Sequence, residues 1–312
     1  MFDGLLAGLL WGLDTVILGI ALARTPFVST EAAVFLAPFV STFIHDFFSS
    51  LWMLLYTGVR GEFSNVLRAL RSKSGKFIVL AALIGGPVGM TGYVLSIKYI
   101  GAAYTAIISS LFPAVGALFS YIFLKEKMKP YQLIGLFVSI GGVIALGYTP
   151  GGSDTSNLVL GFLFAILCVV GWAAEAVIIA YGLKDPQISD SQALQIRQLT
   201  SALFYAVIIL PVLGGWLLST EVLANSTMPV ILLSALFGTA SYLFYYKAIG
   251  KIGASKAMAL NITYCAWAVV FGVIILQQTV SLRDIILGLV IIAGSLIAAA
   301  DLKELIPEKA TS

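Results

Sequence analysis

Four ionisable side chains of this sequence lie inside long apolar stretches, namely Asp14, His45, Asp46 and Glu175. A charged group at membrane depth is costly, so such residues face a cavity or a partner group. Asp14 or Glu175 could bind a substrate ammonium group or hold a proton, and His45 could take part in proton coupling because histidine titrates near neutral pH. The alternative is that each group only fixes helix packing through a hydrogen bond.

Adjacent residues on a helix point about 100° apart, so we expect His45 and Asp46 not to face one common site. For His45, an interhelical hydrogen bond is favoured over a proton relay. It is the single histidine of the chain and has no cysteine nearby, so no metal site is expected. No cofactor is expected either.

Two apolar stretches contain residues that interrupt helices. One carries Gly85, Pro87, Gly89 and Gly92, and the other carries Ser109-Ser110-Leu111-Phe112-Pro113. Proline removes a helical hydrogen bond, and the freed carbonyl groups could coordinate an ammonium group. The four residues of the first stretch, together with Pro113, are therefore candidate hinges. Close helix packing explains the glycines equally well, as Gly4, Gly8 and Gly12 suggest for the first apolar stretch.

Aromatic and polar side chains form a third group of candidates. Asn261 and Tyr264 share one helical stripe in the middle of an apolar stretch, where they could sandwich an apolar group and offer an amide and a hydroxyl. Tyr245 and Tyr246 lie closer to the end of their stretch and are expected at the membrane interface. The residues expected to line a cavity are Trp11, Asp14, Tyr93, Ser109, Phe112, Trp172, Glu175, Tyr242, Asn261 and Tyr264.

The composition places these residues in a membrane protein. Of 312 residues, 60% are hydrophobic and 11% are charged, and the mean hydropathy is +1.01. A soluble domain has roughly a quarter of its residues charged, so a water-soluble globule is excluded. The net charge of +3 is too small to indicate nucleic acid binding. Cys168 and Cys265 lie in apolar runs and are expected to be packed thiols.

Ten apolar stretches are long enough to cross a bilayer, which takes roughly 20 residues each. This predicts an all-α integral membrane protein with ten transmembrane helices and no room for a soluble catalytic domain. The first stretch is expected to be retained, because no basic residue precedes it and Asp14 interrupts it. Residues 58–74 are amphipathic, which predicts a short helix at the membrane interface. The stretches are 2–24, 31–57, 75–98, 102–124, 130–148, 158–183, 192–218, 227–249, 253–276 and 283–302.

The positions of Lys and Arg predict the orientation, because basic loops stay in the cytoplasm. With both termini in the cytoplasm, only Arg24, Lys98 and Arg283 fall on the other side. Lys98, Arg197 and Lys256 are expected near helix ends, which argues against phosphate-bearing substrates in a central cavity. The basic residues of the predicted cytoplasmic segments are Arg60, Arg68, Arg71, Lys73, Lys76, Lys125, Lys127, Lys129, Lys184, Arg197, Lys247, Lys251, Lys256, Lys303 and Lys309.

The two halves of the chain show internal similarity. Trp11 and Asp14 align with Trp172 and Glu175, and Gly101-Ala102 aligns with Gly253-Ala254. The predicted division is a five-helix repeat over residues 1–150, a second over residues 157–306 and a cytoplasmic tail over residues 307–312. Five helices per half force the second copy to be inverted in the membrane, which is an architecture for alternating access around a central cavity.

The run Ile97-Lys98-Tyr99-Ile100-Gly101-Ala102-Ala103, followed by Pro113, Leu124-Lys125-Glu126-Lys127, Gly135 and Gly141-Gly142, resembles the repeat signature of the drug/metabolite transporter superfamily. Within it the sequence looks most like the bacterial aromatic amino acid exporters. The resemblance implies ten helices in the bacterial inner membrane, both termini in the cytoplasm and export of amino acids, including aromatic ones. It also leaves multidrug or other metabolite export open. The second repeat departs from the signature at Cys265 and Gln278.

Two other classes of membrane protein are weighed against a transporter. In an intramembrane hydrolase, Gly253-Ala254-Ser255 would carry the nucleophile and His45 the base, but no final glycine follows the serine. A channel is disfavoured because no filter-like sequence is present. Facilitated diffusion and proton antiport fit the sequence equally well. The expected partners are a small molecule and the lipid bilayer, and a monomer is compatible with the sequence.

Overall fold

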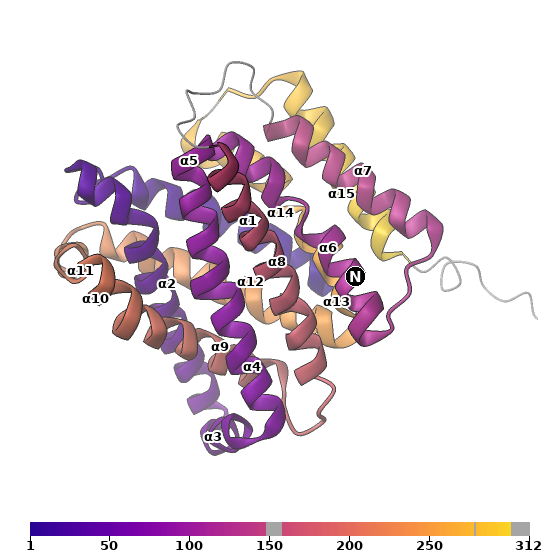
Figure 1. The fold of residues 1–312 in the computed structure, drawn as a ribbon, viewed down its shortest axis with the longest axis horizontal. Coiled ribbons are helices and arrows are strands. Elements are labelled where there is room, and N and C mark those ends of the chain that lie inside the picture. The colour runs from indigo at the N-terminus through magenta and orange to yellow at the C-terminus, as the bar shows by residue number, and fades with distance from the viewer. Residues whose placement is uncertain (148–157, 278, 301–312) are drawn as a thin grey trace, which may run out of the picture.

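The computed structural model describes residues 1–147, 158–277 and 279–300, and its regular elements there are all helices (Figure 1). The first half contains α1 (Phe2–Leu22), α2 (Glu31–Val59), α3 (Phe63–Arg71), α4 (Lys73–Leu83), the π-helical turn η1 (Ile84–Gly89), α5 (Met90–Ser109), α6 (Phe112–Phe119), the π-helical turn η2 (Ser120–Leu124) and α7 (Pro130–Gly147).

The second half begins with α8 (Leu158–Gly182), which is followed by α9 (Asp190–Phe204) and the π-helical turn η3 (Tyr205–Ile209). The remaining helices are α10 (Leu210–Leu213), α11 (Trp216–Leu223), α12 (Met228–Ile252), α13 (Ala254–Asn261), α14 (Tyr264–Leu276) and α15 (Leu282–Ala299). The all-α prediction is therefore confirmed. The predicted outer boundaries at residues 150, 157 and 301–312 lie outside the described residues.

Eight helices of the described part are long and apolar enough to cross a membrane. The predicted fourth and fifth spans correspond to two shorter apolar stretches, Phe112–Leu124 and Pro130–Leu146. Ten crossings therefore stay a prediction. The short amphipathic helix expected between residues 58 and 74 is present as α3, which begins and ends inside that range.

The boundary between the third and fourth predicted spans falls inside α5. The hydroxyls of Ser96 and Thr105 lie 2.8 Å apart in this helix. A straight helix rises about 1.5 Å per residue, so nine residues would separate the two by about 13 Å. The chain therefore turns back between Ser96 and Thr105, which is where the sequence predicts one span to end and the next to begin.

The two halves break their helices at corresponding places. The alignment that pairs Gly101 with Gly253 also pairs the first residues of α6 and α14, which are Phe112 and Tyr264. In each case a two-residue turn precedes the helix. The same alignment matches α7 to α15 along their whole length. The predicted division into two repeats at residues 150 and 157 stays a prediction.

A rare backbone conformation recurs at matched positions. Lys125 and Gln277 have φ angles of 61° and 54°, and they are the non-glycine residues with positive φ among those described. The left-handed conformation is unfavourable for a residue with a side chain, so it is retained only where the surrounding structure requires it. Each of these residues stands at the end of the apolar segment that begins at Phe112 or Tyr264.

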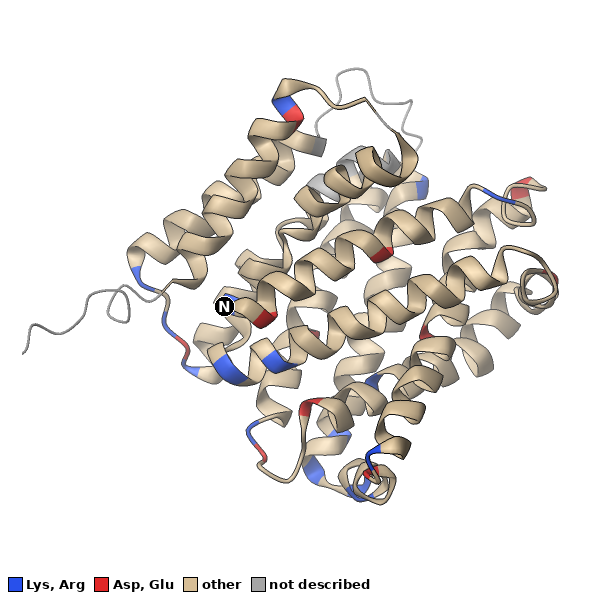
Figure 2. Cartoon of the chain, turned by 180° about the vertical axis from the view of Figure 1, so that it is seen from behind, with Lys and Arg blue, Asp and Glu red and all other residues tan. Residues whose placement is uncertain are grey.

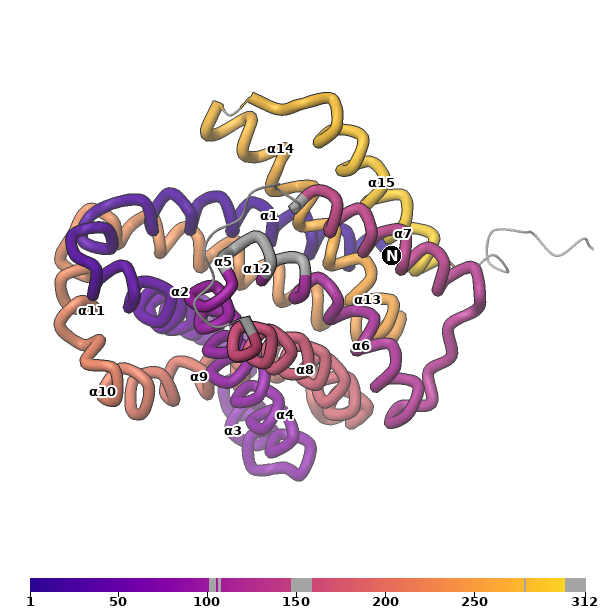
Figure 3. Tube along the Cα trace, turned by 45° about the horizontal axis from the view of Figure 1, so that its top comes forward, coloured from indigo at the N-terminus to yellow at the C-terminus, as the bar shows by residue number. Residues whose placement is uncertain are grey.

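The helices of the two halves pack against each other rather than as separate bodies. Helix α1 lies along α12 and α14, α5 lies along α8, and α7 pairs with α15 at one edge (Figures 1 and 3). Gly4, Gly8 and Gly12 of α1 face Leu260, Thr263 and Trp267. The helices approach so closely that a methyl group at any of the three glycines would collide with the facing residue. The packing role suggested for these three glycines is therefore present.

A carboxylate ties the halves together at the end of the bundle that carries the N-terminus. Glu126 accepts hydrogen bonds from the backbone N–H of Ala254 and of Ser255, each at 3.1 Å, and from the Ser255 hydroxyl at 3.0 Å. These groups belong to the first turn of α13, where a negative charge also meets the positive end of the helix dipole.

We expect Glu126→Gln to lower the stability of the protein by about 1 to 2 kcal/mol, because charge-assisted hydrogen bonds become neutral ones. Thermal unfolding of the purified protein in detergent measures the change. Glu221→Gln removes the same charge from an exposed position and serves as the control. Equal melting temperatures for Glu126→Gln and the unmodified protein would show that the charge of Glu126 does not stabilise the fold.

Candidate functional site

A cavity of about 460 Å³ lies inside the bundle between helices of both halves. Nine of the ten residues expected from the sequence line it, namely Trp11, Asp14, Tyr93, Phe112, Trp172, Glu175, Tyr242, Asn261 and Tyr264. Ser109, the tenth, is buried but is not among the lining residues. The sequence thus located the cavity, while the role of each residue in binding stays a prediction.

The cavity is open toward one end of the bundle and closed toward the other. Gly19, one turn before the end of α1, is exposed and lines it, as does Thr15 one turn earlier. At the closed end, Tyr245 and Tyr246 line the cavity with only 9% and 1% of their surface exposed. Their expected interfacial position is therefore wrong. Both rings pack into the apolar core between α8, α12 and α13, which the distance from a helix end could not indicate.

Five buried ionisable groups form a continuous chain along the cavity wall. His45 Nε2 lies 3.4 Å from Asp14 Oδ1, and His45 Nδ1 bonds Asp46 Oδ1 at 3.4 Å. Arg197 donates through Nη1 to Asp46 Oδ2 at 3.3 Å and through Nε to Glu175 Oε1 at 2.8 Å. We call Asp14, His45, Asp46, Arg197 and Glu175 the ion chain.

His45 and Asp46 therefore face one site, and the expectation that they would diverge is wrong. Both line the cavity, and they contact different partners there: His45 reaches toward α1, and Asp46 reaches toward α9. Because partners stand on both sides of α2, two side chains about 100° apart can belong to one cluster. The hydrogen bond of His45 is made to Asp46 within α2, so it is not the interhelical bond that the sequence favoured. His45 Nε2 faces Asp14 of α1 but has no hydrogen-bond partner among the described residues.

Arg197 is the functional candidate that the sequence reasoning missed. We expected it near a helix end, but it lies about two turns inside α9 and is 4% exposed. Its position within the apolar stretch 192–218 was the available signal. A long side chain can carry its charge further into the bundle than its backbone position indicates.

Four of the five N–H groups of the Arg197 guanidinium donate to protein groups. Besides the two carboxylates, it donates to Gln198 Oε1 at 2.8 Å and to the Tyr242 hydroxyl at 3.1 Å. Its carbon lies 4.6 Å from the centre of the Tyr242 ring, and that ring meets Trp11 edge to face at 4.9 Å. The arginine is thus held by the protein, and one Nη2–H group is left without a partner among the described residues where Arg197 lines the cavity.

Two glycines let neighbouring helices approach the ion chain closely. A Cβ atom at Gly85 would lie 1.8 Å from Glu175 Oε2, and one at Gly238 would lie 2.5 Å from His45 Nε2. Pro87 and Gly89 belong to the π-helical turn η1, and Gly92 packs against the backbone of α8. Close packing therefore accounts for these glycines, while the hinge role of this segment and of Pro113 stays a prediction.

The charges of the ion chain do not cancel. Three carboxylates, those of Asp14, Asp46 and Glu175, face one guanidinium and one imidazole. With His45 protonated the chain carries one excess negative charge, and with His45 neutral it carries two. Asp14 is further stabilised by a hydrogen bond from the Ser234 hydroxyl of α12. With all three carboxylates ionised, the cavity wall is therefore negatively charged in either state of His45.

Aromatic rings form much of the remaining wall. Trp172 lies 5.5 Å from Tyr93 and 6.0 Å from Phe112, measured between ring centres. Asn261 and Tyr264 stand on either side of the break between α13 and α14. The cavity thus combines aromatic surfaces with an excess of carboxylate.

Residues 2–148 and 159–300 match the family of EamA-like transporters. The chain belongs to the EamA-like transporter family. This confirms the resemblance to the drug/metabolite transporter superfamily, and it makes the protein a transporter rather than an enzyme. In this transporter the Ser255 hydroxyl of the hydrolase alternative donates to Glu126, away from the ion chain.

Several curated proteins are similar to this transporter. Protein LicB of Haemophilus influenzae is 36% identical over 218 residues, covering 70% of this chain and 73% of that protein. An uncharacterized transporter of Clostridium kluyveri is 23% identical over 226 residues, or 71% of each chain. Solute carrier family 35 member G1 of Homo sapiens is 28% identical over 204 residues, covering 64% of this chain and 55% of that one.

A crystal structure of a protein with 17% sequence identity shares the fold of this transporter. It superimposes with a TM-score of 0.72 over 95% of this chain and 96% of that chain. The match extends over both halves, so the arrangement of helices around the central cavity belongs to a fold that has been observed in crystals.

We expect Arg197→Met to destabilise this transporter by about 3 to 5 kcal/mol, because Asp46 and Glu175 would be left buried without their cation. Adding Glu175→Gln to that variant should restore part of the loss. Thermal unfolding in detergent gives both values. Full stability of the single variant, or no recovery in the double variant, would contradict the ion chain described above.

Proposed function

We propose that this transporter exports small molecules that carry an ammonium group, among them amino acids with aromatic side chains. The observation that carries the proposal is the excess negative charge of a cavity walled by aromatic rings. An ammonium group would neutralise a charge that the protein itself leaves uncompensated, and ring faces attract a cation as well.

The ring surfaces also suit the apolar part of such a molecule. Aromatic pairs hold a flat or branched side chain between them, as the Trp172, Tyr93 and Phe112 cluster would allow. The Asn261 side chain lines the cavity and has no hydrogen-bond partner in the described part of the chain. Its amide could therefore donate to the carboxylate of a bound amino acid.

A second candidate substrate class is organic cations that lack a carboxylate. The observation that favours it is that four of the five N–H groups of Arg197 already donate to protein groups. Among the described residues no other arginine or lysine lines the cavity, so a substrate carboxylate would find few positively charged donors there. Drug-like or metabolite cations therefore compete with amino acids as the transported class.

The direction of transport rests on the predicted orientation. Most basic residues lie on the side of the molecule that carries the N-terminus (Figure 2), which supports a cytoplasmic position for that side. The closed end of the cavity lies on the same side, and the open end would then face outward across the bacterial inner membrane. Rocking of the two halves would open the Glu126 contact and the pair of Lys251 Nζ with Asp3 Oδ2, 2.8 Å apart.

Uptake by vesicles tests the substrate class. Purified protein in liposomes should accumulate labelled phenylalanine and threonine above the level of empty vesicles, and unlabelled aromatic amino acids should compete. A labelled aromatic cation such as ethidium is measured in parallel. Uptake of the cation alone would assign the second class, and no amino acid uptake would remove the first.

Asp14→Asn should lower transport at least about tenfold at every pH between about 5 and 8, because the neutral amide does not bind an ammonium group as tightly as a carboxylate. Initial uptake rates in the same vesicles measure the effect. Asp284→Asn, at the exposed start of α15, is the matched control. Unchanged rates over the whole pH range would make Asp14 a structural residue.

A further inference from the structure

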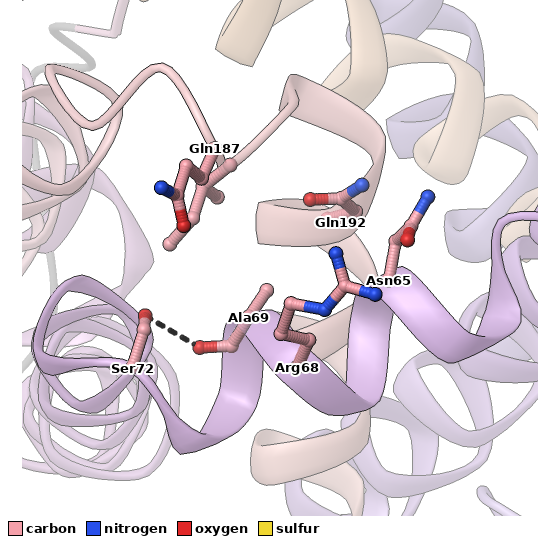
Figure 4. A pocket seen from close by; sticks show the side chains of 7 residues that line it. Asn65, Arg68, Ala69, Ser72, Gln187 and Gln192 are labelled. Atoms are coloured by element: carbon pink, nitrogen blue, oxygen red, sulfur yellow. Dashed lines mark hydrogen bonds between the residues drawn. The ribbon is translucent and has the colours of Figure 1, made fainter.

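A second cavity, of about 330 Å³, lies at the end of the bundle that carries the short helix α3. It is bounded by α3, by the connection between α8 and α9, and by the first turn of α9. Figure 4 shows Arg68 and Asn65 of α3 beside Gln192 of α9, with Gln187 across the cavity. This cavity is separate from the ion chain and shares no lining residue with the central cavity.

Several donor groups around this cavity have no acceptor within the described residues. The side chains of Arg68 and Asn65 make no hydrogen bond or ion pair within the described residues. Gln192 uses its Oε1 atom to accept from the Ser189 N–H at 3.2 Å, which leaves its Nε2 group unpaired. The unused donors of Arg68, Asn65 and Gln192 therefore meet at one place, where the amide oxygen of Asn65 is also unused.

No carboxylate is among the described residues that line the cavity, although Glu62, Asp185 and Asp190 are close to them in the sequence. Glu62 accepts from Arg60 Nε at 2.8 Å and from the Ser191 hydroxyl at 3.2 Å. Asp185 accepts from the Gln187 N–H at 3.0 Å. The local charge is positive, because Arg71, Lys73, Lys76 and Lys184 are all exposed nearby in the sequence. An anion would be attracted to this position and would find hydrogen-bond donors in place.

We propose that this cavity binds a phosphate group, with the headgroup of an anionic phospholipid as its source. The Arg68 guanidinium can donate two parallel hydrogen bonds to phosphate oxygens, and the amides of Asn65 and Gln192 supply further donors. Basic pockets next to membrane helices are suited to anionic headgroups.

The opposite side of α3 fits the lipid source. Phe63, Leu67 and Leu70 are apolar and exposed, at 48%, 44% and 36%, whereas Val66 and Ala69 are buried against the bundle. An amphipathic helix with this pattern lies at the level of the headgroups, with its apolar residues among the acyl chains. A phosphate bound beside Arg68 would then belong to a lipid whose tails contact the exposed apolar residues of α3.

Lipid binding by native mass spectrometry tests the site. Delipidated protein in detergent is titrated with phosphatidylglycerol and, separately, with phosphatidylcholine of the same chains. We expect phosphatidylglycerol to bind preferentially, and Arg68→Gln to weaken that binding at least about tenfold, because a charged donor pair is lost. Arg71→Gln removes the same charge from the same helix outside the cavity and should change the affinity less than about twofold.

The variant Asn65→Ala and the ligand inorganic phosphate distinguish a lipid site from a site for soluble phosphate and from a general effect of charge. Asn65→Ala keeps every charge and should weaken phosphatidylglycerol binding measurably, with an unchanged melting temperature in the absence of lipid. Inorganic phosphate that binds as tightly as the lipid, and does so only when Arg68 is present, would support a phosphate site whose ligand is soluble. Equal losses for Arg68→Gln and Arg71→Gln, or no preference for phosphatidylglycerol, would overturn the proposal.

Discussion

The burial of five ionisable side chains in an apolar bundle is the constraint on which the rest of the structure depends. Away from water each of these groups needs a partner, so α1, α2, α8 and α9 must meet within hydrogen-bond reach of one another. That meeting leaves no room for side chains on the facing helices, and glycines stand there, at Gly85 and Gly238. The cavity is the space that remains beside the ion chain.

The ion chain has a partial symmetry that follows the two halves. Asp14 pairs with His45 of the next long helix, and Glu175 pairs with Arg197 of the next one in its own half. Each of these carboxylates lies against a glycine that comes from a different helix, Gly238 or Gly85. Asp46 has no counterpart in this scheme, and it joins the two pairs into one chain. A rearrangement of either half would therefore change the electrostatic environment of the other.

The sequence predicted the parts of this site that depend on composition and spacing. Charges within apolar stretches and aromatic residues one turn away were enough to place Asp14, Glu175 and Trp172 at a cavity. It did not predict the contacts of Arg197 or the common site of His45 and Asp46, because these depend on which helices become neighbours. Tyr246 shows the same limit: its distance from the helix end suggested the membrane interface, whereas packing between three helices buries it.

The excess negative charge bears on how transport would be driven. A proton and a substrate ammonium group would be alternative ways to neutralise the same carboxylates, so their binding would be competitive without any additional site. Exchange of one for the other across the membrane then needs only that the cavity open to each side in turn. Facilitated diffusion would instead require the ion chain to keep the same protons whether the cavity is empty or occupied. The coupling mechanism thus depends on whether His45 and Asp14 release a proton when the substrate binds.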